Sequence, residues 1–381
     1  MKFDCIVIGA GLAGLTAARD LQEAGKSALI LEATNAVGGR VKSDHVDGYI
    51  LDHGFQVINP KYPQVSKTRV LSKLDFQSIS GKIRLFEEDH LVGYTLGSLS
   101  NKTGSLLEKS KFVGFLINPK VSNAYQFDHY LRAFPKFYQI VLEPFLTGVF
   151  LTDPKEIAAD VAQEILRSFV KSLPGVPANG VGEFSNHLAK PLKHLQLSEP
   201  VLEIKGNSVI TNKNEYLSDF IIVATDPVNE GKLTKRNHSV EMLSSTTCYF
   251  ATSDELRNSK NLVVTKNPGV INSIVISEVS KRYAPEGMNL ISATSLKPLS
   301  DQEFADQLSK IWKTNTNKWD LVGRYEIKNS LPLHLSGHPK LSNLQLAANL
   351  FVIGDHMGMP SQQGAMQTGA VVAKKINQLA R

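Results

Sequence analysis

The chain has 381 residues, of which 42% are hydrophobic and 20% are charged. These proportions are close to globular averages, and they exclude a collagen, a disordered tail and a small disulfide-stapled protein. Lys and Arg outnumber Asp and Glu by 42 to 36, and the net charge of +6 is too modest and too dispersed to indicate nucleic-acid binding.

The first 32 residues have the pattern of a β-α-β unit. Residues 3–8 are mostly apolar and rich in β-branched types, which is typical of a buried parallel strand. Residues 12–24 carry apolar side chains at helical spacing, and Gly25 follows as a stop signal. Residues 27–32 indicate a second strand, so three elements are expected in quick succession.

The next long stretch, from about residue 104 to residue 172, is expected to be mostly helical. One predicted helix covers residues 126–142, where Pro135 should kink or divide it. Another covers residues 154–173, with Asp153 before it as a candidate N-cap.

Strand signals dominate after a turn-rich loop at residues 174–180. A hairpin is predicted over residues 200–212 around Gly206-Asn207, and residues 219–224 indicate a buried strand. Three further strands and one helix are predicted, the strands near 270–277, 289–293 and 321–328 and the helix near 301–313.

The carboxyl end is predicted to form a strand at 350–353, a loop at 354–361 and a helix at 362–379. Because strand-helix signals lie at both ends, we expect an α/β fold with one Rossmann-like nucleotide-binding domain assembled from discontinuous segments, plus an inserted α+β substrate domain. The predicted division gives residues 1–65, 190–230 and 345–381 to the nucleotide-binding domain, and residues 66–189 and 231–344 to the substrate-binding domain.

The turn after the first strand, Gly9-Ala10-Gly11-Leu12-Ala13-Gly14, is a GxGxxG motif in the right context, between a strand and a helix. The first glycine makes the tight turn, the second lets a pyrophosphate approach the backbone, and the third lets the helix pack on the sheet. Glu32 ends the second strand, where its carboxylate can accept hydrogen bonds from ribose hydroxyls and would repel a 2′-phosphate. The unit therefore predicts dinucleotide binding.

The β-α-β unit alone leaves FAD and NAD open, and later motifs separate them. Gly38-Gly39-Arg40 gives a second close backbone approach with a cation beside it, and Asp52-His53-Gly54-Phe55-Gln56 follows. Near the carboxyl end lie Gly354-Asp355-His356 and then Ser361-Gln362-Gln363-Gly364-Ala365, which opens a helix.

With these motifs, Val201 and the run Ile222-Val223-Ala224-Thr225, the chain resembles the FAD-dependent oxidoreductases of the flavin amine oxidase superfamily. That superfamily includes monoamine oxidases, protoporphyrinogen oxidases and phytoene desaturase-type enzymes, and its motifs occur here in the same order. The resemblance implies FAD as the cofactor. It is expected to be non-covalent, because no cysteine lies near the carboxyl-terminal motif.

The resemblance also implies a role for each motif. The pyrophosphate would be cradled by the first turn, at Gly9, Gly11, Leu12, Ala13 and Gly14. Glu32 with Ala33 would hold the adenosine ribose, and the backbone of Val201 would pair with the adenine edge. Gly39, Arg40 and Asp355 would meet the phosphate and ribityl region, Gly54, Phe55 and Gln56 would pass beside the isoalloxazine ring, and the turn at Gln363, Gly364 and Ala365 would start a helix aimed at the pyrimidine ring.

The expected activity is hydride transfer from a hydrophobic or amine-type small molecule to flavin N5, with reoxidation by O2, a quinone or another acceptor. A flavin-dependent non-redox isomerase and a non-catalytic flavoprotein scaffold are the alternatives. No catalytic residue can be named, and the loop His356-Met357-Gly358-Met359-Pro360 has no tyrosine, which disfavours a typical amine substrate.

Other polar residues are interpreted as structural. His53 and His356 are expected to be hydrogen-bonding residues, and His45 with Asp44 and Asp47 a solvated loop, so no metal site is expected. Cys5 and Cys248 are expected in the core. We expect a cytoplasmic protein.

Residues 106–116 leave peripheral membrane contact open. A core-facing helix with a charged outer side is the favoured interpretation of that segment.

Overall fold

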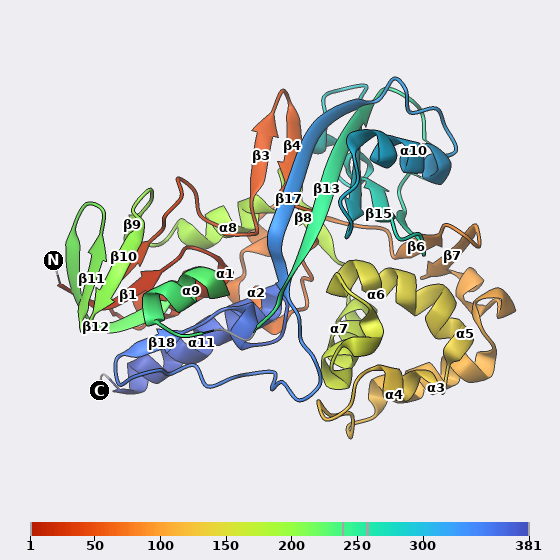
Figure 1. Ribbon diagram of the computed structural model, residues 1–381. Helices are drawn as coiled ribbons and strands as arrows, with labels where there is room; N and C mark the ends of the chain where they lie inside the picture. The colour runs from red at the N-terminus through yellow and green to blue at the C-terminus, as the bar shows by residue number, and fades with distance from the viewer. Residues whose placement is uncertain (1, 238–239, 257–258, 380–381) are drawn as a thin grey trace.

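The computed structural model describes residues 2–237, 240–256 and 259–379, and two seven-stranded sheets organise them (Figure 1). The first sheet has the order β10-β11-β12-β1-β2-β9, with β18 also paired to β12. Its strands are β1 (Lys2–Ile8), β2 (Ala28–Leu31), β9 (His194–Gln196), β10 (Val201–Lys205), β11 (Ser208–Thr211), β12 (Glu215–Val223) and β18 (Leu350–Val352).

Parallel pairing brings distant segments to one edge of this sheet. Ile8 at the end of β1 aligns with Leu31 of β2 and with Val223 of β12, which in turn aligns with Val352 of β18. Because carboxyl ends of parallel strands share an edge, the segments after β1, β2, β12 and β18 meet there. This edge is where the predicted cofactor motifs begin.

Three helices pack around this sheet: α1 (Leu12–Glu23), α8 (Gly182–Ala189) and α11 (Gln362–Leu379). The first and last helices of the chain lie against each other, and a Cβ at Gly369 would overlap the carbonyl of Ala13. Such close backbone contact requires glycine, and it joins the two ends of the chain into one core.

The second sheet has the order β17-β13-β16-β15-β14-β6-β7, and β13 and β17 run as two long antiparallel strands in the centre of Figure 1. The helix α10 (Asp301–Trp312) packs buried Phe304, Leu308 and Trp312 into this sheet's core. The strands are β6 (Lys82–Leu85), β7 (His90–Gly93), β13 (Met242–Thr252), β14 (Leu262–Val264), β15 (Val270–Val275), β16 (Asn289–Ser295) and β17 (Asp320–Pro332).

A group of short helices forms the far end of the molecule from the first sheet (Figure 1). Its core is aromatic, with buried Phe127, Phe134, Tyr138 and Phe150. The helices are α3 (Leu106–Ile117), α4 (Asp128–Leu131), α5 (Pro135–Phe137), a π turn (Tyr138–Leu142), α6 (Glu143–Phe150) and α7 (Ala159–Lys171).

The remaining elements are connectors. They are the hairpin of β3 (Ser43–Val46) with β4 (Tyr49–Asp52), the antiparallel pair of β5 (Phe76–Ser78) with the distant β8 (Gly175–Pro177), and the helices α2 (Pro63–Thr68) and α9 (Pro227–Thr234). Short 3-10 turns lie at Leu71–Lys73, Leu96–Leu99, Asn101–Thr103, Pro154–Glu156, Ile276–Glu278, Lys281–Tyr283 and Asp355–Met357.

The α/β class with a Rossmann-like unit and an insert is confirmed, and the domain boundaries given above stay a prediction. The helix predicted at 126–142 is divided before Pro135, because Phe134 leaves the helical region with φ −146°. Both cysteines are fully buried, as expected, and burial raises the pKa of the Cys248 thiol to about 12.

Two local predictions were wrong in detail. The helix predicted at 154–173 is interrupted at Ile157 and Ala158, which are extended and bridge to Leu335 and Gln126. Asp153 does act as a cap, but of the preceding 3-10 turn, where its carboxylate accepts the N–H of Lys155. Part of the loop predicted at 174–180 forms β8.

The favoured interpretation of residues 106–116 was right in one part and wrong in another. Phe115 and Leu116 face the core, as expected, but the outer side of α3 is mainly apolar and carries exposed Lys111 among its apolar residues. Leu106, Leu107, Val113 and Ile117 are all more than half exposed. None of the helices in the described part of the chain is both long and apolar enough to cross a membrane.

Candidate cofactor site

The turn after β1 leaves an open space at the start of α1. Gly9 has φ +107° and a Cβ there would lie 2.7 Å from the Ala224 carbonyl oxygen, so the turn needs glycine. A Cβ at Gly14 would overlap the Gly9 carbonyl. At Gly11, in contrast, no heavy atom of the described residues outside the adjoining backbone comes within 4 Å of a Cβ position. The second glycine of the motif therefore borders an open cradle.

The cradle suits a diphosphate. Leu12 and Ala13 begin α1, and within the described residues no side chain caps the helix at Gly11. The first N–H groups of a helix have no intrahelical acceptor, and the helix dipole adds about half a positive charge there. A phosphate is the natural partner for such a helix end, so the residues present fit an FAD diphosphate.

Glu32 is fixed beside this turn by three hydrogen bonds. One carboxylate oxygen accepts the N–H of Ala10 at 2.8 Å, and the other accepts the N–H and the hydroxyl of Thr34 at 2.9 and 2.8 Å. Ala33 lies exposed between them. The carboxylate is thus held next to the glycine turn, and its role toward a ribose stays a prediction.

The second glycine pair packs directly against the first turn. The N–H of Gly38 donates to the Ala10 carbonyl at 2.8 Å, and Gly39 faces Gly11 so closely that a Cβ on it would lie 3.3 Å from the Gly11 Cα. Arg40 is the next residue in the chain, so its side chain begins at the edge of the cradle.

Arg40 joins the two ends of the chain. Its guanidinium donates to the Asp355 carboxylate and to the Ser330 carbonyl, both at 2.6 Å, and Asp355 is only 5% exposed. Burial disfavours the charge of Arg40, but attraction to Asp355 outweighs it and raises the pKa of Arg40. The two predicted contacts of the phosphate and ribityl region therefore form one ion pair, 315 residues apart in sequence.

The loop Gly54-Phe55-Gln56 lies beside Arg40. The Gln56 side-chain amide donates to the Arg40 carbonyl at 2.7 Å and to the His53 carbonyl at 2.9 Å. Gly54 has φ +87°, and a Cβ on it would lie 2.9 Å from Ile327 of β17. This loop therefore runs between the cradle and the second sheet.

The start of α11 is tightly packed. Gly364 donates its N–H to the Ser361 hydroxyl at 3.0 Å, and a Cβ on it would overlap the Met359 carbonyl. Gln363 is buried and accepts the N–H of Gln64 at 2.9 Å, while Ala365 continues the helix by donating to the Ser361 carbonyl. The turn therefore contacts the residues just before it in sequence and the helix α2.

Val201 reaches the site through Glu199, a residue that sequence reasoning missed. The N–H of Glu199 donates to the Glu32 carbonyl at 2.9 Å, two residues before Val201 pairs with Thr211. Burial raises the pKa of Glu199, but hydrogen bonds from Thr211, Asn214 and Tyr216 outweigh it and lower that pKa. The backbone of Glu199 thus ties the start of β10 to the end of β2, while its carboxylate holds it to β11 and β12. The only signal was its place just before Val201.

The other sequence candidates have structural partners. His53 lies 2.9 Å from the Asp44 carboxylate, which also accepts the Tyr325 hydroxyl. His356 lies 3.8 Å from the Glu230 carboxylate. Asp44 and His45 belong to β3 and Asp47 to its turn, and the described residues contain no group of three or more His, Cys, Asp or Glu that could hold a metal.

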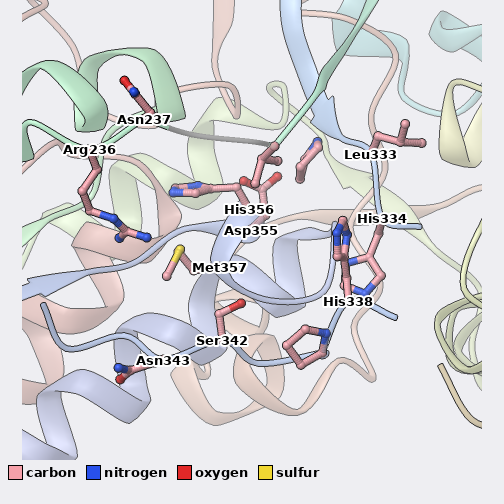
Figure 2. Close-up of a pocket in the computed structure, with 13 residues that line it drawn as sticks. Arg236, Asn237, Leu333, His334, His338, Ser342, Asn343, Asp355, His356 and Met357 are labelled. Carbon is pink, nitrogen blue, oxygen red and sulfur yellow. The ribbon is translucent and has the colours of Figure 1, made fainter. Parts of the chain in front are cut away.

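A cavity of about 310 Å³ lies beside Asp355 (Figure 2). Figure 2 shows Arg236 and Asn237 on one side of it and His334 and His338 on the other. Burial lowers the pKa of His334, so its ring stays neutral near pH 7. Sequence reasoning missed these residues, because only the tertiary fold brings the segment after α9 and the segment after β17 to Asp355.

Comparison with known proteins gives a family match and a fold match. Residues 12–132 match the family described as flavin containing amine oxidoreductase. Putrescine oxidase of Kocuria rosea is 38% identical over 103 residues, which are 27% of this chain and 20% of that protein. L-amino acid dehydrogenase of Synechocystis sp. is 41% identical over 58 residues, 15% of this chain and 12% of that protein. The matched segments thus span about a fifth or less of these relatives.

Solved structures match over nearly the whole chain at low identity. A putative protoporphyrinogen oxidase from Exiguobacterium sp. 255-15 has a TM-score of 0.74 and 15% identity, covering 98% of both chains. A putrescine oxidase variant has a TM-score of 0.76 and 16% identity over 100% of both, and reduced UDP-galactopyranose mutase a TM-score of 0.74 and 15% identity over 99% of this chain and 96% of that one. The expected resemblance is confirmed by both kinds of match, and the fold is the one these proteins share.

Proposed function

We propose that this chain, which resembles the flavin containing amine oxidoreductases in sequence over residues 12–132 and in fold over its length, is an FAD-dependent oxidoreductase. The observation that carries the proposal is the open cradle at Gly11, bordered by an uncapped helix start and by Arg40 paired with Asp355. These groups converge from both ends of the chain on one edge of the first sheet.

Within this proposal the cofactor is FAD, held without a covalent bond. Glu32 disfavours a 2′-phosphate, and the close approach of Gly39 to Gly11 lengthens the cradle beyond the first turn. Cys5 and Cys248 are buried inside β1 and β13, away from the start of α11, so neither is placed to form a thioether.

The chain's own residues supply binding and positioning. When bound, the FAD ring is an acceptor for a hydride from the substrate. The start of α1 and Arg40 would neutralise the diphosphate, while Glu32 and the backbone of Val201 would hold the adenosine half. The start of α11 would aim its positive end at the pyrimidine ring and stabilise negative charge there.

The substrate proposed is a small apolar molecule, with an amine-type molecule as the second choice. Phe55 and Val57 pack against Val141 of the helical end and Ile274 of the second sheet. Met359, just before α11, belongs to the aromatic core of the helices. A substrate that reaches the ring between these layers meets mostly apolar side chains, which exclude water and hold the reacting carbon in place.

The electron acceptor proposed is O2, a quinone or another small oxidant. A molecule apolar enough for this site also partitions into lipid, so we propose in addition that the protein makes peripheral contact with a membrane.

The test is spectroscopic. The purified protein should be yellow, and acid precipitation should release the flavin into the supernatant; colour left in the pellet would contradict non-covalent binding. A true substrate should bleach the flavin under anaerobic conditions, and air or a quinone should restore the colour. A colourless protein that takes up no FAD would refute the proposal.

A non-redox isomerase is the second candidate, because reduced UDP-galactopyranose mutase has the same fold. Electron stoichiometry separates the two. Net bleaching by substrate without an acceptor supports the oxidoreductase, whereas turnover only by the pre-reduced protein, with no net electron transfer, supports the isomerase. A flavin that no donor reduces would instead indicate a non-catalytic scaffold.

A further inference from the structure

The outer side of α3 carries an apolar surface that the protein itself does not cover. Leu106, Leu107, Val113 and Ile117 are 61%, 64%, 53% and 72% exposed. They occupy one side of the helix at positions i, i+1, i+7 and i+11, with the open space next to Gly114 between them. We call these four side chains the α3 face.

The segment before α3 carries two more exposed leucines. Leu96 and Leu99, in the 3-10 turn at residues 96–99, are 84% and 60% exposed. The turn is attached to α3, because the Lys109 ammonium donates to the Ser100 carbonyl at 2.6 Å. A soluble surface rarely gathers six large aliphatic side chains so close in sequence and this exposed, which marks a contact site.

The charges within residues 94–120 are mostly positive. Residues 94–120 contain four lysines, Lys102, Lys109, Lys111 and Lys120, and one carboxylate, Glu108. The Glu108 side chain is used in the capping box with Ser105 and also accepts the N–H of Lys136. Lys102, Lys111 and Lys120 are exposed, so the surface offers leucines flanked by free positive charge.

The opposite side of α3 is anchored in the helical core. Phe115 and Leu116 are buried, and the Arg167 guanidinium and the Gln163 amide of α7 donate to backbone carbonyls at residues 115–118. The helix is thus fixed with its apolar side outward, at the end of the molecule away from the first sheet (Figure 1). Its 12 residues are too short to span a bilayer, but they suit a helix that lies in the headgroup plane.

We propose that the α3 face, extended by Leu96 and Leu99, docks the protein on an anionic lipid bilayer, with the leucines in the headgroup boundary and Lys102, Lys111 and Lys120 on the lipid phosphates. Membrane docking rests on the proposed function, because an apolar substrate would partition into the lipid. The core that holds α3 includes Met359, just before α11, so the helix that carries the α3 face packs on the same apolar core as the loop before α11.

Sedimentation with vesicles tests the surface. The full chain should pellet with phosphatidylcholine vesicles that contain phosphatidylglycerol, and less with phosphatidylcholine alone. The triple variant Leu106→Ser, Leu107→Ser, Ile117→Ser should lower the partition coefficient about a hundredfold, because three exposed aliphatic contacts are lost. The variant Lys111→Glu with Lys120→Glu should lower it at least about tenfold on the anionic vesicles only.

The matched control removes three exposed aliphatic side chains from the other end of the molecule. Leu202, Leu217 and Val228 are 62%, 48% and 55% exposed, and the triple serine variant there should bind vesicles like the parent chain. Failure of the parent to bind, or equal loss in both triple variants, would overturn the proposal. So would sedimentation equilibrium showing that the α3 variant only dissociates a dimer, because the face would then cover a second copy.

Flavin content separates this inference from the proposed function. Each variant keeps the cradle at Gly11, so each should retain the parent's FAD and its anaerobic reduction. Vesicle binding by a chain that takes up no FAD would support the α3 face and refute the proposed function. Retained FAD without vesicle binding would do the reverse.

Discussion

Gly11 and Gly364 stand at the starts of the first and last helices, and their surroundings are opposite. Outside the adjoining backbone, no heavy atom in the described part of the chain lies within 4 Å of a Cβ at Gly11, whereas a Cβ at Gly364 would overlap the Met359 carbonyl. The first glycine leaves room for something other than protein, and the second lets two protein segments touch. The same residue type at equivalent places thus borders open space at one end and allows close packing at the other.

The two regions also differ in how they are held. The Gly11 turn is fixed by neighbours from residues 9–38, such as Glu32 and Gly38. The Gly364 region is fixed by Arg40 through Asp355 and by Gln64 through Gln363, about 300 residues away. The hydrogen bonds of the first region are therefore local in sequence, although Gly9 also packs against Ala224, whereas the second region is held by residues from the other end of the chain.

The largest expected effect is that of Gly364→Ala. The added methyl group has no space, so the free energy of unfolding should fall by about 3 kcal/mol or more. Urea denaturation measures it. The control is Gly114→Ala in α3, where space is open and alanine favours the helix, so stability should rise by up to about 1 kcal/mol. Equal stability of the two variants would contradict the packing role of Gly364.

A pH titration tests Asp52, a carboxyl group that depends on long-range partners, as the Gly364 region does. It is 2% exposed and accepts hydrogen bonds from Ser43, Val181 and Tyr283; burial outweighs these bonds and raises the pKa of Asp52 to about 6. Because the folded-state pKa of Asp52 is higher than the unfolded-state pKa, near 4, the protonated carboxyl stabilises the folded protein. This stabilisation is complete below about pH 4 and is lost as the pH rises through about 6.

Asp52→Asn should remove that pH dependence. The stability of the parent relative to the variant should therefore fall by roughly 2 to 3 kcal/mol from about pH 4 to about pH 7. Urea denaturation of both proteins across this range measures the difference. A constant difference would show that Asp52 is ionised to the same extent in both the folded and the unfolded chain.

Glu32→Ala tests whether the Gly11 turn and the carboxylate beside it bind FAD. Loss of the charged acceptor should weaken FAD binding by about 2 kcal/mol, a change of roughly tenfold to a hundredfold in Kd. Fluorescence titration of the apoprotein with FAD measures it, with Glu203→Ala on β10 as the control carboxylate. An unchanged Kd would mean that Glu32 only orders the turn through Ala10 and Thr34.

Gly11→Ala has the smallest expected effect and the most selective one. Because the space is open, the fold should lose less than about 1 kcal/mol, while the methyl group should weaken FAD binding roughly tenfold by filling the cradle. The same titration and a urea curve measure the two effects. A large loss of stability with unchanged FAD binding would reverse the roles assigned to Gly11 and Gly364.

Part of the site could be predicted because it is local. Gly9, Gly11, Gly14 and Glu32 lie in one strand-turn-helix-strand pattern, whose spacing has a direct physical reason. Glu199, in contrast, carries no pattern of its own, although it pins Val201 beside Glu32. His334 likewise reaches Asp355 only because the tertiary fold brings the segment after β17 there.

The α3 segment shows a different limit. Its sequence, Leu-Leu-Glu-Lys-Ser-Lys-Phe-Val-Gly-Phe-Leu-Ile, is apolar on two sides, so periodicity cannot tell which side faces the core. The fold decided it by burying Phe115 and Leu116 against α7 and leaving Leu106, Leu107 and Ile117 outside.

The amino-acid sequence by itself determined the elements, the glycine turns and the order of the motifs, because backbone geometry and hydrophobic period act over a few residues. Only the tertiary structure decided that Arg40 pairs with Asp355 and that α3 turns leucines outward. Those outcomes depend on contacts between residues far apart in the chain, and a contact of that kind leaves no spacing to recognise.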